Sequence, residues 1–225
     1  NAPQSIIKLA KDNNINPIYV CDESFSGFMQ FYQRCQEEKI EGRFGLKLIV
    51  VDDLAQKDEE SLKNESKVTV WILNTAGYKD AIKIFTKAAC DGFYYVPRID
   101  WKTLKELWTD NLASSFPYYS SFLYKNLLTY TSIVPDFGFT APVFFREIGA
   151  NLPFDNLLND ALTQYTKDKY QILDIKSIYY NKRQDFCAYT VFRAIHGRNT
   201  FEDVNIDHFS SAEFSLESYL ELIND

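Results

Sequence analysis

The side chains of this sequence that could bind a metal ion or move a proton are few and scattered. Two carboxylates, Asp22 and Glu23, directly follow the short apolar segment 17–21. The only histidines are His196 and His208, and a lone histidine is more often a surface or hydrogen-bonded core residue than a ligand. The cysteines have no paired metal-ligand spacing: Cys21, Cys35, Cys90 and Cys187. By themselves these residues define no metal site.

Predicted strands position the two carboxylates and two lysines. Residues 17–21 (PIYVC) are short and apolar, typical of a buried strand, and the carboxylates follow its carboxyl end. Residues 46–51 (LKLIVV) and 68–73 (VTVWIL) are nearly all apolar and rich in β-branched side chains. This composition favours strands buried on both faces, as in parallel sheets. Lys47 lies inside the first of these two strands, and Lys67 directly precedes the second.

Helical patterns alternate with the strands. Apolar residues recur at helical spacing in segments 3–10, 28–35, 77–89, 104–107, 157–165, 191–195 and 217–225, and further strands are expected at 142–145 and 170–175. The alternation predicts an α/β fold with helices outside a parallel sheet, open or closed. We interpret the polar run 52–67 as a solvated loop between two strands.

Size and composition indicate a globular protein. The chain has 225 residues, 46% hydrophobic and 24% charged, so it can bury a sizeable core as one domain over 1–225. Its 24 Lys and Arg against 31 Asp and Glu give a net charge of -7, which argues against this chain alone binding a phosphate backbone.

The expected compartment is the cytoplasm. No stretch approaches the roughly 18 consecutive apolar residues of a membrane span, and residues 1–11 lack a signal-peptide core. The four cysteines are predicted to be reduced, buried thiols.

The run 77–107 combines a helix, a glycine turn and a Pro-Arg-Ile-Asp corner. Tyr78, Ile82, Phe85 and Ala89 form one apolar stripe, which predicts a core-facing helix with Asn74 or Thr75 as its N-cap. We expect Asp91-Gly92 to end it through a positive φ, and Asp100 or Thr103 to cap the helix carrying Leu104 and Leu107.

This run resembles the polymerase and histidinol phosphatase (PHP) domain at the N-terminus of bacterial DNA polymerase III alpha subunits, which has Gly-Tyr, an apolar helix, Asp-Gly-Phe-Tyr-Tyr and Pro-Arg-Ile-Asp in the same order. Segments 197–218 and 5–24 are similar to two further family segments. The resemblance implies a distorted seven-stranded βα barrel, TIM-like and of the PHP type. An open alternative is that the first strand, with its His-x-His pair, is lacking, because the sequence begins at the family's first helix.

Active members of this family hold two or three metal ions that activate water against a phosphoester. Matching the motifs places Asp22 and Glu23 at the family's Asp-His pair, Lys47 at a metal-binding Glu, and Lys67 at a His. The late Asn-Asp-x-His motif falls on Lys176, Ser177, Ile178 and Tyr179, which loses both ligands. The family's Gly-Cys motif has no clear match near 112–117. The resemblance therefore implies a degenerate metal site with no catalytic residue and no metal or other cofactor; bound Mn²⁺ or Mg²⁺ is the alternative.

The two lysines suggest a substitution. We hypothesise that the ammonium groups of Lys47 and Lys67 replace metal charge beside the carboxylates of Asp22 and Glu23. The alternative is that they are unrelated surface lysines.

Aromatic residues are dense in 116–130 and recur at Phe137, Phe139, Phe144 and Phe145. Core packing is the preferred interpretation, because the spacing is helical and cations are sparse; stacking on single-stranded bases is the alternative. The acidic helix 217–225 is predicted to be a solvated face.

The resemblance implies a non-catalytic PHP-like domain with a structural or protein-interaction role in DNA replication. Expected partners are polymerase domains or a proofreading exonuclease subunit, with DNA contacted only indirectly and no membrane contact. A parent protein would be a DNA-directed DNA polymerase, a nucleotidyltransferase. Two alternatives stay open: an active metal-dependent phosphoesterase or 3′–5′ exonuclease, and a decoy that binds a replication protein.

Overall fold

The computed structural model describes residues 5–197 and 211–224. The chain divides into two compact units, Asn1–Val143 (unit 1) and Phe144–Asp225 (unit 2). The prediction of one domain over 1–225 stays a prediction. The fold is mixed α/β, and most predicted helices and strands are confirmed.

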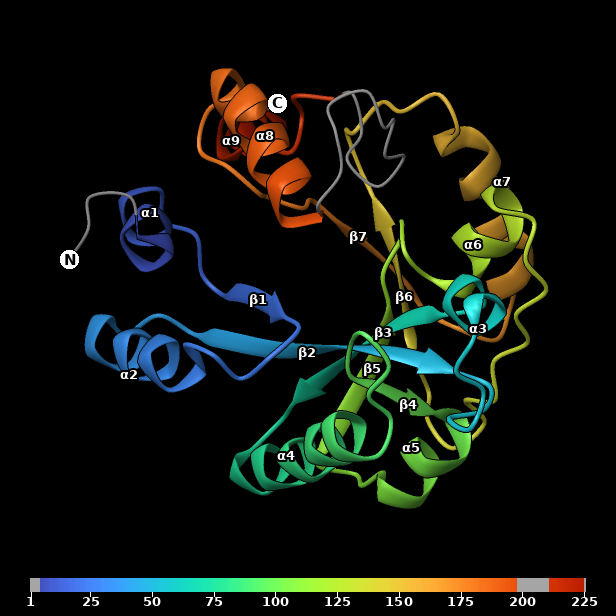
Figure 1. Ribbon diagram of the computed structural model, residues 1–225. Coiled ribbons are helices and arrows are strands. Elements are labelled where there is room, and N and C mark those ends of the chain that lie inside the picture. Colours follow the sequence, from blue (N-terminus) through green and yellow to red (C-terminus); the bar gives the residue numbers. More distant parts are fainter. Residues whose placement is uncertain (1–4, 198–210, 225) are drawn as a thin grey trace. The chain divides into compact units, whose positions relative to one another are not determined.

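The elements of unit 1 follow one another in the order drawn in Figure 1: α1 (Ile6–Asp12), β1 (Ile18–Asp22), α2 (Phe28–Glu38), β2 (Gly42–Val51), α3 (Glu59–Lys63), β3 (Ser66–Ile72), α4 (Thr75–Cys90), β4 (Arg98–Asp100), α5 (Trp101–Leu107), β5 (Leu112–Phe116) and α6 (Phe122–Leu128). In the described residues of unit 2 they are β6 (Val143–Glu147), α7 (Asp155–Thr166), β7 (Ile172–Ile175), the short 3₁₀ helix η1 (Arg183–Asp185), α8 (Phe186–Gly197) and α9 (Leu216–Asn224).

The sheet of unit 1 mixes strand directions. β2 pairs in parallel with β1 and β4, but β3 runs antiparallel to both β2 and β5. The prediction of a parallel sheet is therefore wrong for β3. Apolar composition reports burial of a strand rather than its direction, and residues 52–65 return the chain directly to the neighbouring position.

The two faces of this sheet differ in chemistry. Phe44, Leu46, Leu48 and Val50 of β2 share one face and are all buried. An aromatic ring of α2 packs on this face: the centroid of the Phe28 ring lies 4.7 Å from that of Phe44. This apolar face forms the core with α2 and α4, and the opposite face of β2 carries Lys47.

Helix α4 begins where the sequence predicts. The Asn74 side chain accepts a hydrogen bond from the Gly77 backbone N–H at 2.9 Å, which satisfies one free donor of the first turn. The predicted apolar stripe is displaced, however. The buried apolar residues are Gly77, Ala81, Ile84 and Ala88, whereas Ile82 is exposed. Small residues lie closest to the sheet, and the larger Tyr78 and Phe85 reach the ring of Phe25 from the flank.

Gly92 ends the helix for a different reason from the one expected. Its φ is not in the left-handed region, and a Cβ built there would lie 1.8 Å from the Arg98 carbonyl oxygen. The position needs glycine because two backbone segments approach closely. The next helix, α5, is capped as predicted, with the Asp100 carboxylate accepting from the Thr103 N–H at 2.7 Å.

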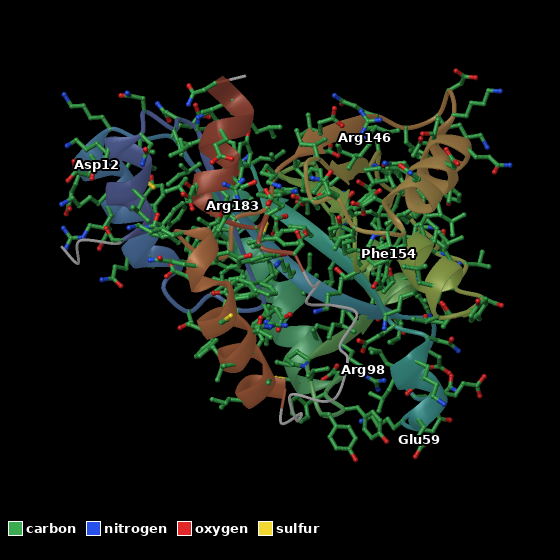
Figure 2. All side chains as sticks on the ribbon, turned by 90° about the horizontal axis from the view of Figure 1, so that it is seen from above. Asp12, Glu59, Arg98, Arg146, Phe154 and Arg183 are labelled. Atoms are coloured by element: carbon green, nitrogen blue, oxygen red, sulfur yellow. The ribbon has the colours of Figure 1, made fainter. Side chains whose placement is uncertain are left out.

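The polar run 52–67 is more ordered than the predicted loop. It contains α3, whose N-terminus is closed by a capping box between Asp58 and Ser61. Arg98, labelled together with Glu59 in Figure 2, is fully buried and fixes this segment from β4. Its guanidinium donates to the Ser61 hydroxyl at 3.1 Å and to the Gln56 carbonyl at 3.2 Å. The buried arginine thus holds Ser61 and the Gln56 backbone in place, while most polar side chains of the segment are exposed, as the loop prediction implies.

The aromatic residues of unit 1 form core, as the preferred interpretation holds. Phe116, Phe122 and Phe137 are nearly inaccessible, and the Phe116 ring lies 5.1 Å from each of the other two. The edge-on arrangement of these rings is typical of packed aromatic clusters.

Unit 2 contains a parallel strand pair, β6 with β7, beside α7. The Phe144 ring lies 5.7 Å from that of Tyr165 and 5.4 Å from that of Tyr170. On the exposed side of the pair, Arg146 donates to both carboxylate oxygens of Asp174, at 2.6 and 2.9 Å. Phe144 therefore also belongs to a core.

The acidic C-terminal helix is not merely a solvated face. The guanidinium of Arg183 binds the carboxylates of Glu213, at 3.1 Å, and of Glu221 in α9, at 2.6 Å. The Glu217 carboxylate accepts from the Arg183 backbone N–H. Charge-assisted hydrogen bonds from Arg183 therefore hold α9 against η1.

The predicted burial of the cysteine thiols is confirmed in full for one of them only. All four cysteines are free thiols, but only Cys35 is buried, Cys21 is half-buried, and Cys90 and Cys187 are exposed because they lie on the outer sides of α4 and α8.

In the part of the chain that the structure describes, no helix is long and apolar enough to cross a membrane.

Candidate functional site

The strongest candidate site is the second face of the unit 1 sheet, which we call the polar face. Strand register determines its members, because residues paired across neighbouring strands point to the same side. Gly45 pairs with Cys21 and Trp71, Lys47 pairs with Thr69, and Thr69 pairs with Ser115. Together with Tyr19 and Lys67, these residues form the polar face: Tyr19, Cys21, Gly45, Lys47, Lys67, Thr69, Trp71 and Ser115.

Two lysines meet on the polar face. Lys67 lies opposite Ile49, two residues along β2 from Lys47, so the lysines occupy diagonal positions on neighbouring antiparallel strands. Both are half-buried. The ammonium of Lys67 donates to a Glu23 carboxylate oxygen at 3.0 Å. The structure thus brings together two of the predicted site residues, Glu23 and Lys67.

The structure does not bring Asp22 to Lys47. Asp22 pairs with Leu46, on the apolar side of the register, one residue out of phase with Lys47. Its carboxylate instead accepts a hydrogen bond from the Glu23 backbone N–H at 2.6 Å. The register therefore places Asp22 and Lys47 on opposite faces of the sheet, because a shift of one residue along a strand changes the face. The predicted replacement of metal charge by ammonium groups stays a prediction.

An indole forms the flat part of the polar face. Trp71 lies over Gly45, where a Cβ would meet its ring carbons at 3.0 and 3.1 Å. Its Nε1–H donates to the Ser115 hydroxyl at 2.8 Å, and the ring of Tyr19 meets it edge-on at 5.6 Å. Gly45 thus lets the ring lie close to the sheet, and the bond to Ser115 fixes its orientation.

The half-buried thiol of Cys21 is a neutral member of the face. Burial raises the pKa of Cys21 to about 11, and the positive charge of Lys47 opposes that rise only weakly. At neutral pH this free thiol is protonated, which makes it a weak nucleophile.

The other two predicted positions, Ser177 and Tyr179, lie in unit 2, where Ser177 contacts a buried carboxylate, Glu147, that the sequence analysis missed. Ser177 donates to Glu147 twice, from its backbone N–H at 2.7 Å and from its hydroxyl at 2.6 Å. Tyr179 is exposed and stacks on Tyr189, with ring centroids 5.5 Å apart. Ser177 therefore binds a carboxylate of the fold in the position that the resemblance gives to a metal ligand.

Glu147 has an unusual acidity. Burial raises its pKa to about 7, although the two hydrogen bonds from Ser177 and the charge of Lys176 oppose the rise. The Lys176 ammonium itself donates to the Gly149 carbonyl at 2.9 Å. A glutamate at the end of β6, two residues after the apolar run Val143–Phe145, was the available signal in the sequence.

The donors of the polar face do not fit a metal cluster. Such a cluster needs several carboxylate, imidazole or thiolate ligands, whereas this face presents two ammonium groups, two hydroxyls and a protonated thiol. Among residues 5–197 and 211–224, no group of three or more His, Cys, Asp or Glu side chains lies close enough to hold a metal ion. His208 and the side chain of His196 are outside the described part.

Comparison with known proteins gives the class. A family model for the PHP domain matches residues 1–133, more than half of the chain, and this chain therefore belongs to the PHP domain family.

Two relatives make the class more specific. The chain is similar to the DNA polymerase III subunit alpha of Helicobacter pylori, with 28% identity over 116 residues in strain 26695 and 27% in strain J99. The aligned segment is 51% of this chain and 10% of each relative. The chain thus aligns with about a tenth of the length of the curated relatives that it matches.

Proposed function

We propose that this chain is a non-catalytic PHP domain with a structural or protein-interaction role in DNA replication. The observation that supports the proposal is the residue type at two positions of the polar face. Lys47 and Lys67 stand at positions that the family resemblance gives to metal ligands. Each ammonium would lie near the cations of a metal cluster, and at about 4 Å the repulsion of two unit charges costs several kcal/mol at the effective dielectric of a protein surface.

The proposed fold is the distorted seven-stranded βα barrel of the family. Seven strands in the described residues, helices on the apolar side of the unit 1 sheet and the parallel β6–β7 pair support it. In that arrangement the polar face would line the interior, where active relatives bind metal.

The proposed partners are polymerase domains or a proofreading exonuclease subunit, in the cytoplasm. The similarity to replicative polymerase subunits supports this choice, and the net charge of -7 favours protein contact over direct DNA binding. Asp22 and Glu23 would then be remnants of the metal site.

An exonuclease assay tests the proposal. The protein is incubated with a mismatched primer–template in the presence of Mn²⁺ or of EDTA, with Asp22→Ala as the matched variant. We expect the same background cleavage in all four combinations. Cleavage that needs Mn²⁺ and is lost in Asp22→Ala would overturn the proposal in favour of a phosphoesterase.

A further inference from the structure

The turn between α4 and β4 presents two aromatic rings to solvent. Phe93 is 53% exposed and Tyr95 is 74% exposed. Both belong to residues 92–97, which we call the aromatic turn and which lie entirely within unit 1. Single exposed rings are common on protein surfaces, but rings grouped in one short turn form an apolar patch that is typical of a contact surface.

Contacts within and below the aromatic turn fix its conformation. The Tyr94 backbone N–H donates to the Val96 carbonyl at 3.1 Å, which closes the turn. The Arg98 guanidinium lies 4.9 Å from the centre of the Tyr94 ring and donates to the Gly92 carbonyl at 3.4 Å. Tyr95 has a φ of 61°, in the left-handed region, and a bulky residue keeps that conformation only where its surroundings impose it. The exposed rings are therefore preorganised for a partner.

An acidic segment lies beside the aromatic turn. Residues 52–60 (DDLAQKDEE) contain five carboxylates and one lysine, all exposed. Arg98 binds this segment at the Gln56 carbonyl, 3.2 Å away. A Cβ built at Gly92 would lie 3.0 Å from the Leu54 side chain, so the turn and the segment are in contact.

The charge of the acidic segment is not neutralised by the fold. Among the residues that the structure describes, none of its five carboxylates forms an ion pair. The segment therefore presents a net charge of -4 next to the two exposed rings. Such a surface attracts a partner that carries positive charge.

We propose that the aromatic turn and the acidic segment together bind an extended, arginine-containing basic segment of a protein partner. A guanidinium stacks on an aromatic ring and also forms paired hydrogen bonds with a carboxylate, so arginine suits both halves of the surface. A second copy of this chain is disfavoured as the occupant, because its own net charge of -7 adds repulsion. The inference rests on the proposed protein-interaction role, for which it names a surface and the chemistry of a partner.

Fluorescence polarisation tests the inference with a labelled peptide of alternating arginine and alanine residues at low salt. The main variant is Tyr95→Asn, and Tyr130→Asn is its matched control. Tyr130 is 91% exposed and has a φ of 54°, so both changes replace an exposed tyrosine by asparagine, which tolerates the left-handed region. We expect Tyr95→Asn to weaken peptide binding about fivefold, because a cation–π contact is lost. Tyr130→Asn should bind like the parent.

Two double variants separate local charge from total charge. Glu59→Gln with Glu60→Gln removes two carboxylates from the acidic segment, whereas Asp110→Asn with Asp136→Asn removes two exposed carboxylates elsewhere in unit 1. We expect only the first pair of changes to weaken binding, again about fivefold. A peptide with glutamate in place of arginine should not bind.

Any of three results would overturn the inference: no saturable binding of the arginine peptide, equal losses in Tyr95→Asn and Tyr130→Asn, or equal losses in the two double variants. Self-association of the parent in analytical ultracentrifugation, abolished by Tyr95→Asn, would assign the surface to a second copy and overturn the inference as well. Its failure differs from that of the proposed function. A lack of peptide binding leaves the non-catalytic assignment standing, whereas Mn²⁺-dependent cleavage overturns that assignment.

Discussion

At the scale of single residues, charged groups in unusual surroundings distinguish this chain. Arg98 is fully buried, and its guanidinium donates to two backbone carbonyls and a hydroxyl. The Tyr94 ring faces it at 4.9 Å and adds a cation–π contact. Arg98 therefore holds the segment 52–61 to β4 through hydrogen bonds more than through charge pairing.

The Arg98 contacts predict a large loss of stability on truncation. Arg98→Met would leave the Ser61 hydroxyl and the Gln56 carbonyl without their donor, at a cost of about 1–3 kcal/mol for each buried group. We expect the free energy of unfolding in urea to fall by about 2–4 kcal/mol. Lys102→Met, on the exposed side of α5, should change it by less than about 0.5 kcal/mol. Equal effects of the two changes would contradict this role of Arg98.

Glu147 predicts a pH dependence of stability. Burial raises the pKa of Glu147 in the folded state to about 7, well above the ordinary value of 4.5, so the folded state binds the proton more tightly. The contribution of Glu147 to the free energy of unfolding is therefore fully present below about pH 4.5 and is lost as the pH rises through about 7. The loss is at most about 3 kcal/mol.

Urea unfolding between pH 4.5 and 8 measures this effect of Glu147. Glu147→Gln keeps both hydrogen bonds to Ser177, because its amide accepts from the N–H and donates to the hydroxyl, and it should flatten the decline. Glu59→Gln, at an exposed position on α3, serves as control and should leave the slope unchanged. A parallel decline in parent and Glu147→Gln would show that other groups cause it.

At the scale of elements, the type and caps of helices and strands could be predicted from the sequence, but strand direction and the buried side of α4 could not. Periodicity gave the existence and type of α4, β2 and β3 correctly, and the cap residues Asn74 and Asp100 were recognisable because capping is a local interaction. The direction of β3 was not predictable, since composition alone does not encode which strand lies next to it. The buried side of α4 was displaced because helix packing favours small residues at the closest contact.

Close backbone approach makes Gly92 indispensable between α4 and β4. Gly92→Ala would place a methyl group 1.8 Å from the Arg98 carbonyl oxygen, so the backbone must move. We expect a loss of more than about 2 kcal/mol in the free energy of unfolding. Gly138→Ala is the matched control, because a Cβ there meets nothing within 4 Å and φ is not left-handed. Its unfolding free energy should match that of the parent within about 0.5 kcal/mol or exceed it slightly.

At the scale of the whole molecule, family membership and site chemistry point in different directions. The match over residues 1–133 establishes a PHP domain, while the proposed function holds that Lys47 and Lys67 stand where metal binding would require ligands of another charge. The sequence predicted the two lysines and the two carboxylates as one site, but not which carboxylate binds which lysine. Register decides which side chains meet, so Glu23 rather than Asp22 faces Lys67.

The central claim is that the polar face binds no metal ion. Electron paramagnetic resonance of free Mn²⁺ tests it directly, because Mn²⁺ that binds the protein loses its sharp solution signal. We predict that adding the protein leaves the free Mn²⁺ signal unchanged at equimolar concentrations, and that Asp22→Asn behaves identically. A stoichiometric loss of the signal that Asp22→Asn restores would contradict the account.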